Sequence, residues 1–431
     1  MGFVRFVHAA DLHLDSPFRG LRAVEPEIGE VLRDATFASY NKIIDLCIAE
    51  EADALLVAGD IYDSGDRSLR AQLRFRDGLQ RLADVGIRSF VCHGNHDPLD
   101  GWEAQIDMPA GCHRFGPEVE AVPVDPSQPD GVVVYGVSFP QRDVHENLAR
   151  RFQRDARHLY AIGLLHANVG RDTGHEPYAP CTVEDLERSG MDYWALGHVH
   201  TRAVLREQNP TVVYPGNPQG RHRAEGGARG VALVDVGDDR HARVHFRDVD
   251  VVRWETELLN IAEIAGEQQL LEILDERVNA IAAAAAGRHA VIIVRLGGRG
   301  ALHYTLRRGD TAEALRAQLN DSLRGRDPFV WCAAVKVETA PPFDREERRQ
   351  SQDFLADVLR LVDEIQTQGT VPEWLQEPLT VLYEQSRVRR YLAQPPDEIA
   401  LLQLLDRAEE RCVEALLAAE ESSALAGRPS L

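Results

Sequence analysis

The sequence is poor in lysine, has no paired cysteines and contains no long apolar run. Only two of its 48 basic residues are lysines (Lys42 and Lys336), a skew that reflects codon usage more readily than function. The six cysteines are scattered without a CxxC pair, which argues against a disulfide framework and a zinc knuckle and favours a reduced protein. No stretch approaches the ~18 consecutive apolar residues of a membrane helix, and the N-terminal segment lacks the apolar core of a signal peptide. We therefore expect a cytoplasmic protein without a membrane anchor.

Positive charge is also scarce. The 431 residues include 69 acidic and 48 basic side chains, which gives a formal net charge of −21. Binding to a phosphate backbone needs local positive potential, so this balance argues against a protein that coats nucleic acid as histones do. It does not exclude an enzyme that acts on nucleic acid, because bound metal ions supply positive charge of their own. The length predicts two or three globular domains.

A recurring pattern in the first half of the chain indicates the fold class. Five apolar, β-rich runs each end in a short polar cluster, at residues 3–9, 54–58, 89–92, 160–165 and 193–196. Helical stretches over 27–51 and 68–85 follow the first two runs. Strand, polar loop and helix in alternation predict an α/β sandwich, in which ligands collect at the C-terminal ends of strands. Later strand-like runs, at 132–139, 211–214, 230–236 and 242–251, predict a second, partly antiparallel sheet.

The organisation changes near Trp254. Helices over 267–286 and 311–323 alternate with strands over 290–296 and 329–338, and we interpret this small α/β unit as a cap. After a proline turn at 340–342 the chain is helical, with apolar stripes at helical spacing. The predicted domains are residues 1–252, 253–342 and 343–431.

Polar clusters built from the same few residue types follow the five strand-like runs. They are Asp11-Leu12-His13, Gly59-Asp60-Ile61-Tyr62-Asp63, Gly94-Asn95-His96-Asp97, His166 within LLHAN, and Gly197-His198-Val199-His200. Carboxylate, amide and imidazole donors together suit manganese, iron or zinc. Alternate residues of an extended segment point the same way, so both side chains of a DxH or HxH pair should reach one site. Each cluster alone is more often a capped turn or a hydrogen-bonded histidine, but five in order predict a two-metal centre for phosphate chemistry.

The ordered set D-x-H, G-D-x-x-D, G-N-H-D, H and G-H-x-H resembles the calcineurin-like metallophosphoesterase superfamily. Within it, the segments FVHAADLHLDSPFRGL and GDIYD resemble the bacterial SbcD-type DNA repair exonucleases, particularly their YhaO-like branch. The resemblance implies a two-sheet α/β sandwich with a small α/β cap domain and a C-terminal helical region. It also implies hydrolysis of DNA phosphodiesters with two divalent metal ions, manganese being favoured over iron and zinc.

The resemblance further implies a role for individual residues. The implied metal ligands are Asp11, His13 and His200 for the first ion, Asn95, His166 and His198 for the second, and Asp60 as the bridge. A hydroxide held by the metal pair would be the nucleophile. His96 would stabilise the transition state or protonate the leaving oxygen, and Asp63 would orient His96. Asp97 is expected only to cap a turn.

Other functions stay open at this point. One is the same chemistry on a small or cyclic phosphodiester or a phosphoprotein, against which the cap and the helical tail weigh. Another is a non-catalytic DNA-binding or scaffold subunit of a coiled-coil ATPase complex, against which the complete ligand set weighs. SbcD-type proteins bind a coiled-coil ATPase through a C-terminal helical region, so the resemblance implies an SbcC-like ATPase and DNA as partners, and a homodimer. The locally basic stretch 219–229 is either a DNA-backbone contact or a solvated loop.

Overall fold

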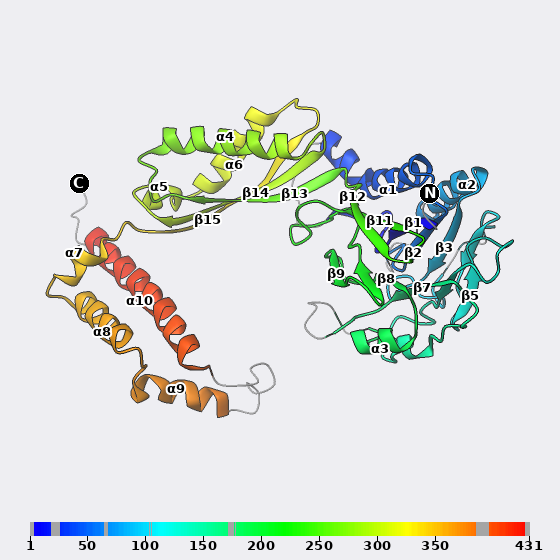
Figure 1. The fold of residues 1–431 in the computed structure, drawn as a ribbon. Coiled ribbons are helices and arrows are strands. Elements are labelled where there is room, and N and C mark those ends of the chain that lie inside the picture. Colours follow the sequence, from blue (N-terminus) through cyan, green and yellow to red (C-terminus); the bar gives the residue numbers. More distant parts are fainter. Residues whose placement is uncertain are drawn as a thin grey trace. The chain divides into compact units, whose positions relative to one another are not determined.

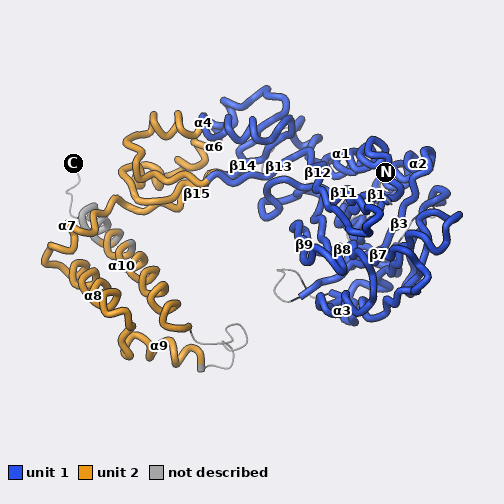
Figure 2. Tube along the Cα trace, in the orientation of Figure 1, with its two compact units in different colours: residues 1–257, 276–293, 316–334 blue, residues 258–275, 294–315, 335–431 orange. Residues whose placement is uncertain are grey.

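The computed structural model describes residues 4–18, 26–63, 68–102, 104, 106–170, 176, 178–384 and 396–426. Its Cα trace divides into two compact units, coloured separately in Figure 2. The first unit comprises residues 1–257, 276–293 and 316–334, and the second comprises residues 258–275, 294–315 and 335–431. Among the described helices, none is both long and apolar enough to cross a membrane.

Strands alternate with helices at the start of the first unit, whereas several of its later strands follow one another directly (Figure 1). The strands of its two large sheets are β1 (Val4–Ala9), β2 (Ala54–Ala58), β3 (Arg88–Cys92), β4 (Cys112–Arg114), β5 (Glu120–Pro123), β6 (Val132–Gly136), β7 (Tyr160–His166), β8 (Tyr193–Gly197), β9 (Ala203–Arg206), β10 (Thr211–Tyr214), β11 (Gly230–Val236) and β12 (Ala242–Asp248). The accompanying helices are α1 (Pro26–Ala49), α2 (Leu69–Asp84), the 3-10 helix η1 (Leu148–Arg151) and α3 (Val183–Arg188).

These strands form two six-stranded mixed sheets, which confirms the expected sandwich. The first sheet runs β12-β11-β1-β2-β3-β4 and the second runs β5-β6-β7-β8-β10-β9. The inner strands are parallel, and antiparallel pairing occurs toward the sheet edges. One expectation is wrong: the runs at 230–236 and 242–251 do not join the second sheet, because β11 pairs with β1 and β12 with β11. An apolar run specifies which face is buried but not which sheet accepts the strand.

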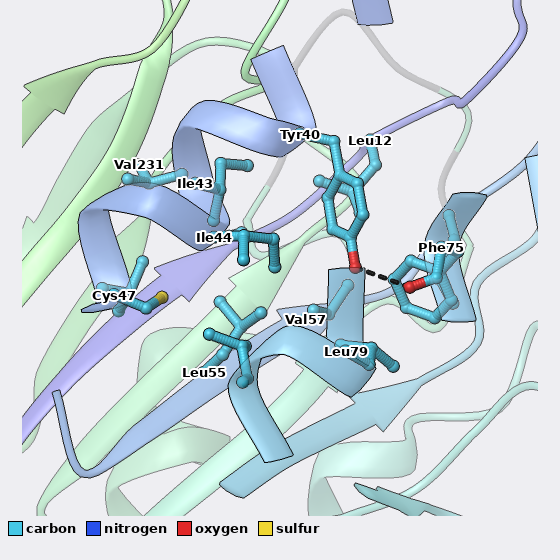
Figure 3. Close-up of a cluster of buried hydrophobic side chains, with 14 of the residues drawn as sticks. Leu12, Tyr40, Ile43, Ile44, Cys47, Leu55, Val57, Phe75, Leu79 and Val231 are labelled. Atoms are coloured by element: carbon cyan, nitrogen blue, oxygen red, sulfur yellow. Dashed lines mark hydrogen bonds between the residues drawn. The ribbon is translucent and has the colours of Figure 1, made fainter. Parts of the chain in front are cut away.

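Alternation along each strand separates the two faces of the first sheet. Leu55 and Val57 of β2 belong to the cluster under α1 and α2, whereas Leu56 packs between the two sheets. Figure 3 shows the cluster under the helices, where the Tyr40 hydroxyl of α1 donates a 2.8 Å hydrogen bond to the Phe75 carbonyl of α2. Because β1, β2 and β3 are parallel, their C-terminal ends lie at one edge, and the site is built there.

A third sheet has the order β13-β14-β15. Its strands and helices are β13 (Val252–Asn260), α4 (Glu267–Ala284), β14 (His289–Arg299), α5 (His303–Leu306), α6 (Thr311–Leu323) and β15 (Val330–Ala340). The sequence predicts the two later strands and the two longer helices. It misses β13, in which partly buried and exposed residues alternate from Glu255 to Leu258 and two of them, Glu255 and Glu257, are acidic. Within the first unit, Trp254 and Trp331 of this sheet share an apolar cluster with Ile28 of α1.

The C-terminal part is helical, as expected. Its helices are α7 (Arg345–Arg349), α8 (Phe354–Gln368), α9 (Glu373–Glu384) and α10 (Glu398–Ala426). Helix α8 begins at the N-cap Asp353 and ends at Gly369, which adopts the left-handed conformation (φ 70°) that terminates helices. Leu359 of α8 packs on Val413 of α10.

Candidate metal centre

The residues that the sequence proposes for the site all follow or end strands of the two large sheets. Asp11 and His13 follow β1, Asp60 and Asp63 follow β2, Asn95 and His96 follow β3, His166 ends β7, and His198 and His200 follow β8. The structure brings these loops together. Ligand atoms of three residue groups each lie within 4.8 Å of one another: Asp11, His13 and His200; Asp11, Asp60 and His166; and His13, Asp63 and His96.

Several of these side chains stand on strained backbone. Asp11, His13, Asp60 and His198 have φ values of 52°, 43°, 52° and 98°, in the left-handed region that residues with a Cβ rarely adopt. The extended DxH segment expected from the sequence is therefore wrong, because β1 has ended at Ala9 and a turn presents both side chains. Such strain persists where the surroundings impose it, and it clusters at functional sites.

The four histidines of the cluster each direct one ring nitrogen outward to an oxygen. The partners are Asp63 Oδ1 for His13 Nδ1 (3.0 Å), Glu225 Oε1 for His200 Nδ1 (2.7 Å), the Ala58 carbonyl for His166 Nδ1 (2.9 Å) and the Glu176 carbonyl for His198 Nε2 (2.8 Å). Carbonyl and carboxylate oxygens only accept, so the outward nitrogens carry the protons. The other nitrogen of each neutral ring then carries a lone pair, through which histidine binds a metal.

The atoms inside the cluster are mostly acceptors. His13 Nε2 and His200 Nε2 lie 3.2 Å apart, and His166 Nε2 lies 3.0 Å from Asn95 Oδ1 and 3.5 Å from Asp60 Oδ2. With the outward nitrogens protonated, these close pairs bring lone pairs face to face, an arrangement that a shared cation stabilises. The donor set of imidazole, carboxylate and amide therefore fits divalent metal ions of the borderline class.

The electrostatics of the cluster point the same way. Burial raises the pKa of Asp60 to about 6, and burial together with the charge of Asp60 raises the pKa of Asp11 well above its usual range. Burial lowers the pKa of His166 to about 4 and lowers the pKa of His13 well below its ordinary value. Without cations, the site thus holds neutral imidazoles beside carboxylates that resist ionisation, and bound cations would offset that cost.

His96 is the more accessible histidine beside this cluster. Its Nδ1 lies 2.9 Å from Asp63 Oδ1, and its side chain is 34% exposed against 1% for His13. Burial lowers the pKa of His96, but the hydrogen bond that His96 donates to Asp63 and the charge of Asp60 outweigh burial and raise the pKa. Burial would raise the pKa of Asp63, yet hydrogen bonds from His13 and His96 lower it well below its usual range. Asp63 and His96 line a cavity of about 430 Å³.

Asp97 does more than the turn cap that the sequence predicts. Its buried carboxylate accepts hydrogen bonds from the backbone N–H groups of Gly94 (2.8 Å), Ile61 (2.9 Å) and Asp60 (3.2 Å). Asp97 therefore holds the loop after β2 against the loop after β3. No local pattern signals this role, because the two loops are far apart in the sequence.

Glu225 and Arg221 are contacts of the site that the sequence does not reveal. Glu225 accepts the outward N–H of His200, and Arg221 places Nη1 3.2 Å from Asp63 Oδ2 and Nη2 3.3 Å from Glu225 Oε1. The solvated-loop interpretation of the 219–229 stretch is therefore wrong for Arg221 and Arg229, which are only 9% and 8% exposed, and a DNA-backbone contact there stays a prediction. The one available signal was a lone acidic residue, Glu225, inside a basic stretch.

Comparison with known proteins identifies the family. The model for calcineurin-like phosphoesterases matches residues 4–202, the range that contains all five polar clusters. The model for the middle domain of the metallophosphoesterase YhaO matches residues 254–340. The uncharacterized metallophosphoesterase YhaO of Bacillus subtilis is 37% identical over 343 residues, which cover 78% of this chain and 81% of that protein. The chain belongs to the calcineurin-like metallophosphoesterases. It is therefore a metal-dependent phosphoesterase, and its predicted likeness to the YhaO-like branch is confirmed.

Nucleases are among the more distant relatives of this metallophosphoesterase. The SbcD subunit of the nuclease SbcCD of Bacillus subtilis is 26% identical over 269 residues, 54% of this chain and 66% of its own length. The DNA double-strand break repair protein Mre11 of Aeropyrum pernix is 28% identical over 224 residues, 49% of this chain and 53% of its own. The chain thus spans half to two thirds of these nucleases. A solved dimetal phosphatase from Danio rerio covers 55% of the chain with a TM-score of 0.36 and 9% identity.

Proposed function

We propose that this metallophosphoesterase hydrolyses phosphodiester bonds in DNA, as an exonuclease or endonuclease of the SbcD type. The observation that carries the proposal is the set of outward hydrogen bonds that aims three imidazoles, those of His13, His166 and His200, at two buried carboxylates. The substrate class is supported by the relatives from the nuclease SbcCD and from Mre11.

Two divalent cations, which we propose to be manganese, would share the ligand cluster. Their proposed ligands are Asp11, His13 and His200 for one, Asn95, His166 and His198 for the other, and Asp60 between them. When bound, such cations neutralise charge on a phosphate and lower the pKa of water toward neutrality. The protein's own contribution is rigidity, because Asp97 and the outward acceptors hold the ligand loops and rings in place.

His96 would then serve the leaving oxygen. Its Nδ1 is engaged by Asp63, which leaves Nε2 to face the substrate. The raised pKa keeps a larger share of His96 protonated near neutrality, as a general acid requires. Asp63 would be the residue that orients it.

The other parts of the chain would supply substrate and partner contacts. We propose residues 1–252 as the nuclease domain, 253–342 as a cap that contacts DNA and 343–431 as the docking region for an SbcC-like coiled-coil ATPase. Exposed apolar side chains on the C-terminal helices support a docking role: Phe354 is 69% exposed, Trp374 56%, Val381 60% and Ile399 71%.

The decisive experiment is manganese-dependent cleavage of end-labelled linear duplex DNA. Wild type, Asp60→Asn and His96→Ala would be assayed together with His245→Ala, which alters a half-exposed histidine of β12 away from the cluster. We expect cleavage by wild type and His245→Ala only, with bound metal reduced in Asp60→Asn but not in His96→Ala. Turnover of bis(p-nitrophenyl) phosphate without any DNA cleavage, alone or with the ATPase, would instead favour a small phosphodiester as substrate.

A further inference from the structure

The guanidinium of Arg221 lies between the two carboxylates that orient histidines of the centre. Besides its contacts with Asp63 (3.2 Å) and Glu225 (3.3 Å), Nη1 lies 3.1 Å from Ser16 Oγ. The backbone N–H of Arg221 donates a further bond of 2.7 Å to Glu225 Oε2. The side chain is thus held at both of its terminal nitrogens, and the backbone N–H of Arg221 helps to hold Glu225.

Each of these carboxylates, held by Arg221, in turn accepts hydrogen bonds from imidazole rings. Asp63 Oδ1 accepts from Nδ1 of His13 and Nδ1 of His96, and Glu225 Oε1 accepts from Nδ1 of His200. A carboxylate with one oxygen held by a guanidinium cannot rotate freely, so the ring nitrogen that faces it is also held. Arg221 therefore acts through Asp63 and Glu225 on three histidines, which lie on three different loops.

We propose that Arg221 is a positioning residue of the metal centre, which bridges Asp63 and Glu225 and thereby fixes which nitrogen of His13, His96 and His200 faces the cluster. The proposal rests on the metal-dependent hydrolysis proposed above. It concerns the arrangement of the ligands and holds for any phosphodiester substrate.

The geometry argues against a phosphate-binding role for Arg221. Its charge is compensated by two carboxylates, and the side chain is 9% exposed. A substrate phosphate would have to compete with Asp63 and Glu225 for this guanidinium, and displacing either carboxylate would release the histidines that it holds. An arginine is also better suited to this bridge than lysine, because its planar fork reaches two acceptors at once and an ammonium does not hold both in fixed geometry.

A purely electrostatic role makes the opposite prediction to a positioning role. Arg221 is a positive charge near the proposed metal ions, so its loss should tighten cation binding if charge alone matters. If Arg221 positions the ligands, its loss should weaken cation binding, because outer partners of ligating histidines typically change metal affinity or activity by about 10–100-fold. The sign of the change in Mn²⁺ affinity separates the two.

The test compares Arg221→Lys and Arg221→Met with Arg229→Lys in the full chain. Arg229 lies in the same segment and is as deeply buried, but it donates to neutral groups only, namely the His200 carbonyl, Asn217 Oδ1 (2.9 Å) and the Gly226 carbonyl (3.2 Å). Mn²⁺ dissociation constants would be measured by electron paramagnetic resonance. Long-range 1H–15N spectra of the metal-free, histidine-labelled protein would report the ring tautomers.

We expect Arg221→Lys to weaken Mn²⁺ binding by about 10–100-fold, to lower kcat on bis(p-nitrophenyl) phosphate more than it raises KM, and to mix the tautomers of His13 and His200. Arg229→Lys should lose thermal stability yet keep the Mn²⁺ affinity and the tautomers. Unchanged or tighter Mn²⁺ binding with unchanged tautomers in Arg221→Lys or Arg221→Met would overturn the proposal. Neither the affinity nor the spectra require a substrate, so absence of DNA cleavage would refute the nuclease assignment without deciding the role of Arg221.

Discussion

His96 Nδ1 lies 2.9 Å from the same Asp63 oxygen that faces His13 Nδ1 at 3.0 Å. One carboxylate oxygen therefore serves both a proposed metal ligand and the proposed proton donor. A change at Asp63 should affect metal binding and proton transfer together.

Replacing Asp63 by asparagine should lower kcat/KM on a phosphodiester by about 10–100-fold. Asp63 raises the pKa of His96, so the protonated ring persists to higher pH in the wild type. Without that carboxylate, activity that needs protonated His96 should be lost at a lower pH as the pH rises. The measurement is the pH profile of kcat/KM, with Asp235→Asn, a surface carboxylate paired with Arg5, as the control. An unshifted profile in Asp63→Asn would argue against His96 as the acid.

Asp60 should make the metal-free protein less stable as the pH rises. Its pKa is raised from 3.8 to about 6, so the folded state retains a proton that the unfolded state releases, and stability falls as the pH passes through this window. At neutral pH the metal-free Asp60→Asn variant should therefore unfold at a higher urea concentration than metal-free wild type. Mn²⁺ should stabilise the wild type more than the variant. Equal urea midpoints for the two metal-free proteins would show that Asp60 carries no such penalty.

Removing the Asp97 carboxylate should destabilise the fold itself. Asp97→Ala leaves three backbone N–H groups without their acceptor, and each unsatisfied buried group costs about 1–3 kcal/mol. We expect a loss of about 3 kcal/mol or more in the free energy of unfolding, measured with denaturant. Asp97→Asn keeps one acceptor oxygen, so its free energy of unfolding should lie between those of wild type and Asp97→Ala. A loss well under 1 kcal/mol would mean that water replaces the carboxylate.

Helix α9 offers a test of the proposed ATPase contact. Trp374 and Val381 are seven residues apart on α9 and are 56% and 60% exposed. The double variant Trp374→Asp/Val381→Asp should therefore fold normally. We expect the double variant to lose binding to the coiled-coil ATPase while its Mn²⁺-dependent turnover of bis(p-nitrophenyl) phosphate is unchanged. Val204→Asp, which alters a 48% exposed residue of β9, should lose neither. Full ATPase binding by the double variant would place the contact elsewhere.

The sequence predicts those features that depend only on residues close together in the chain. The polar clusters stand next to the strands that carry them, so the loops of Asp60 and His166 could be placed from local pattern alone. What the sequence does not predict depends on contacts between distant segments. Three such features arise only after the sheets have assembled: the left-handed turn at Asp11, the hydrogen bond that the loop after β2 donates to Asp97, and the contact of Glu225 with His200. The position of Glu225 in a basic stretch of the sequence does not indicate that it will contact His200.

The pairing of β1 with β11 has a consequence for the growing chain on the ribosome. Val4 lies opposite Val236, so the strand that leads into Asp11 gains its antiparallel neighbour only after residues well beyond the family match at 4–202 have been made. Until then one side of β1 is an open edge, able to pair with another chain. A fragment that ends at residue 202 would keep every proposed ligand. It would still lack β11 and β12, the two strands that complete the first sheet on the side of β1. We therefore expect metal binding to require β11 and β12, although neither strand carries a proposed ligand.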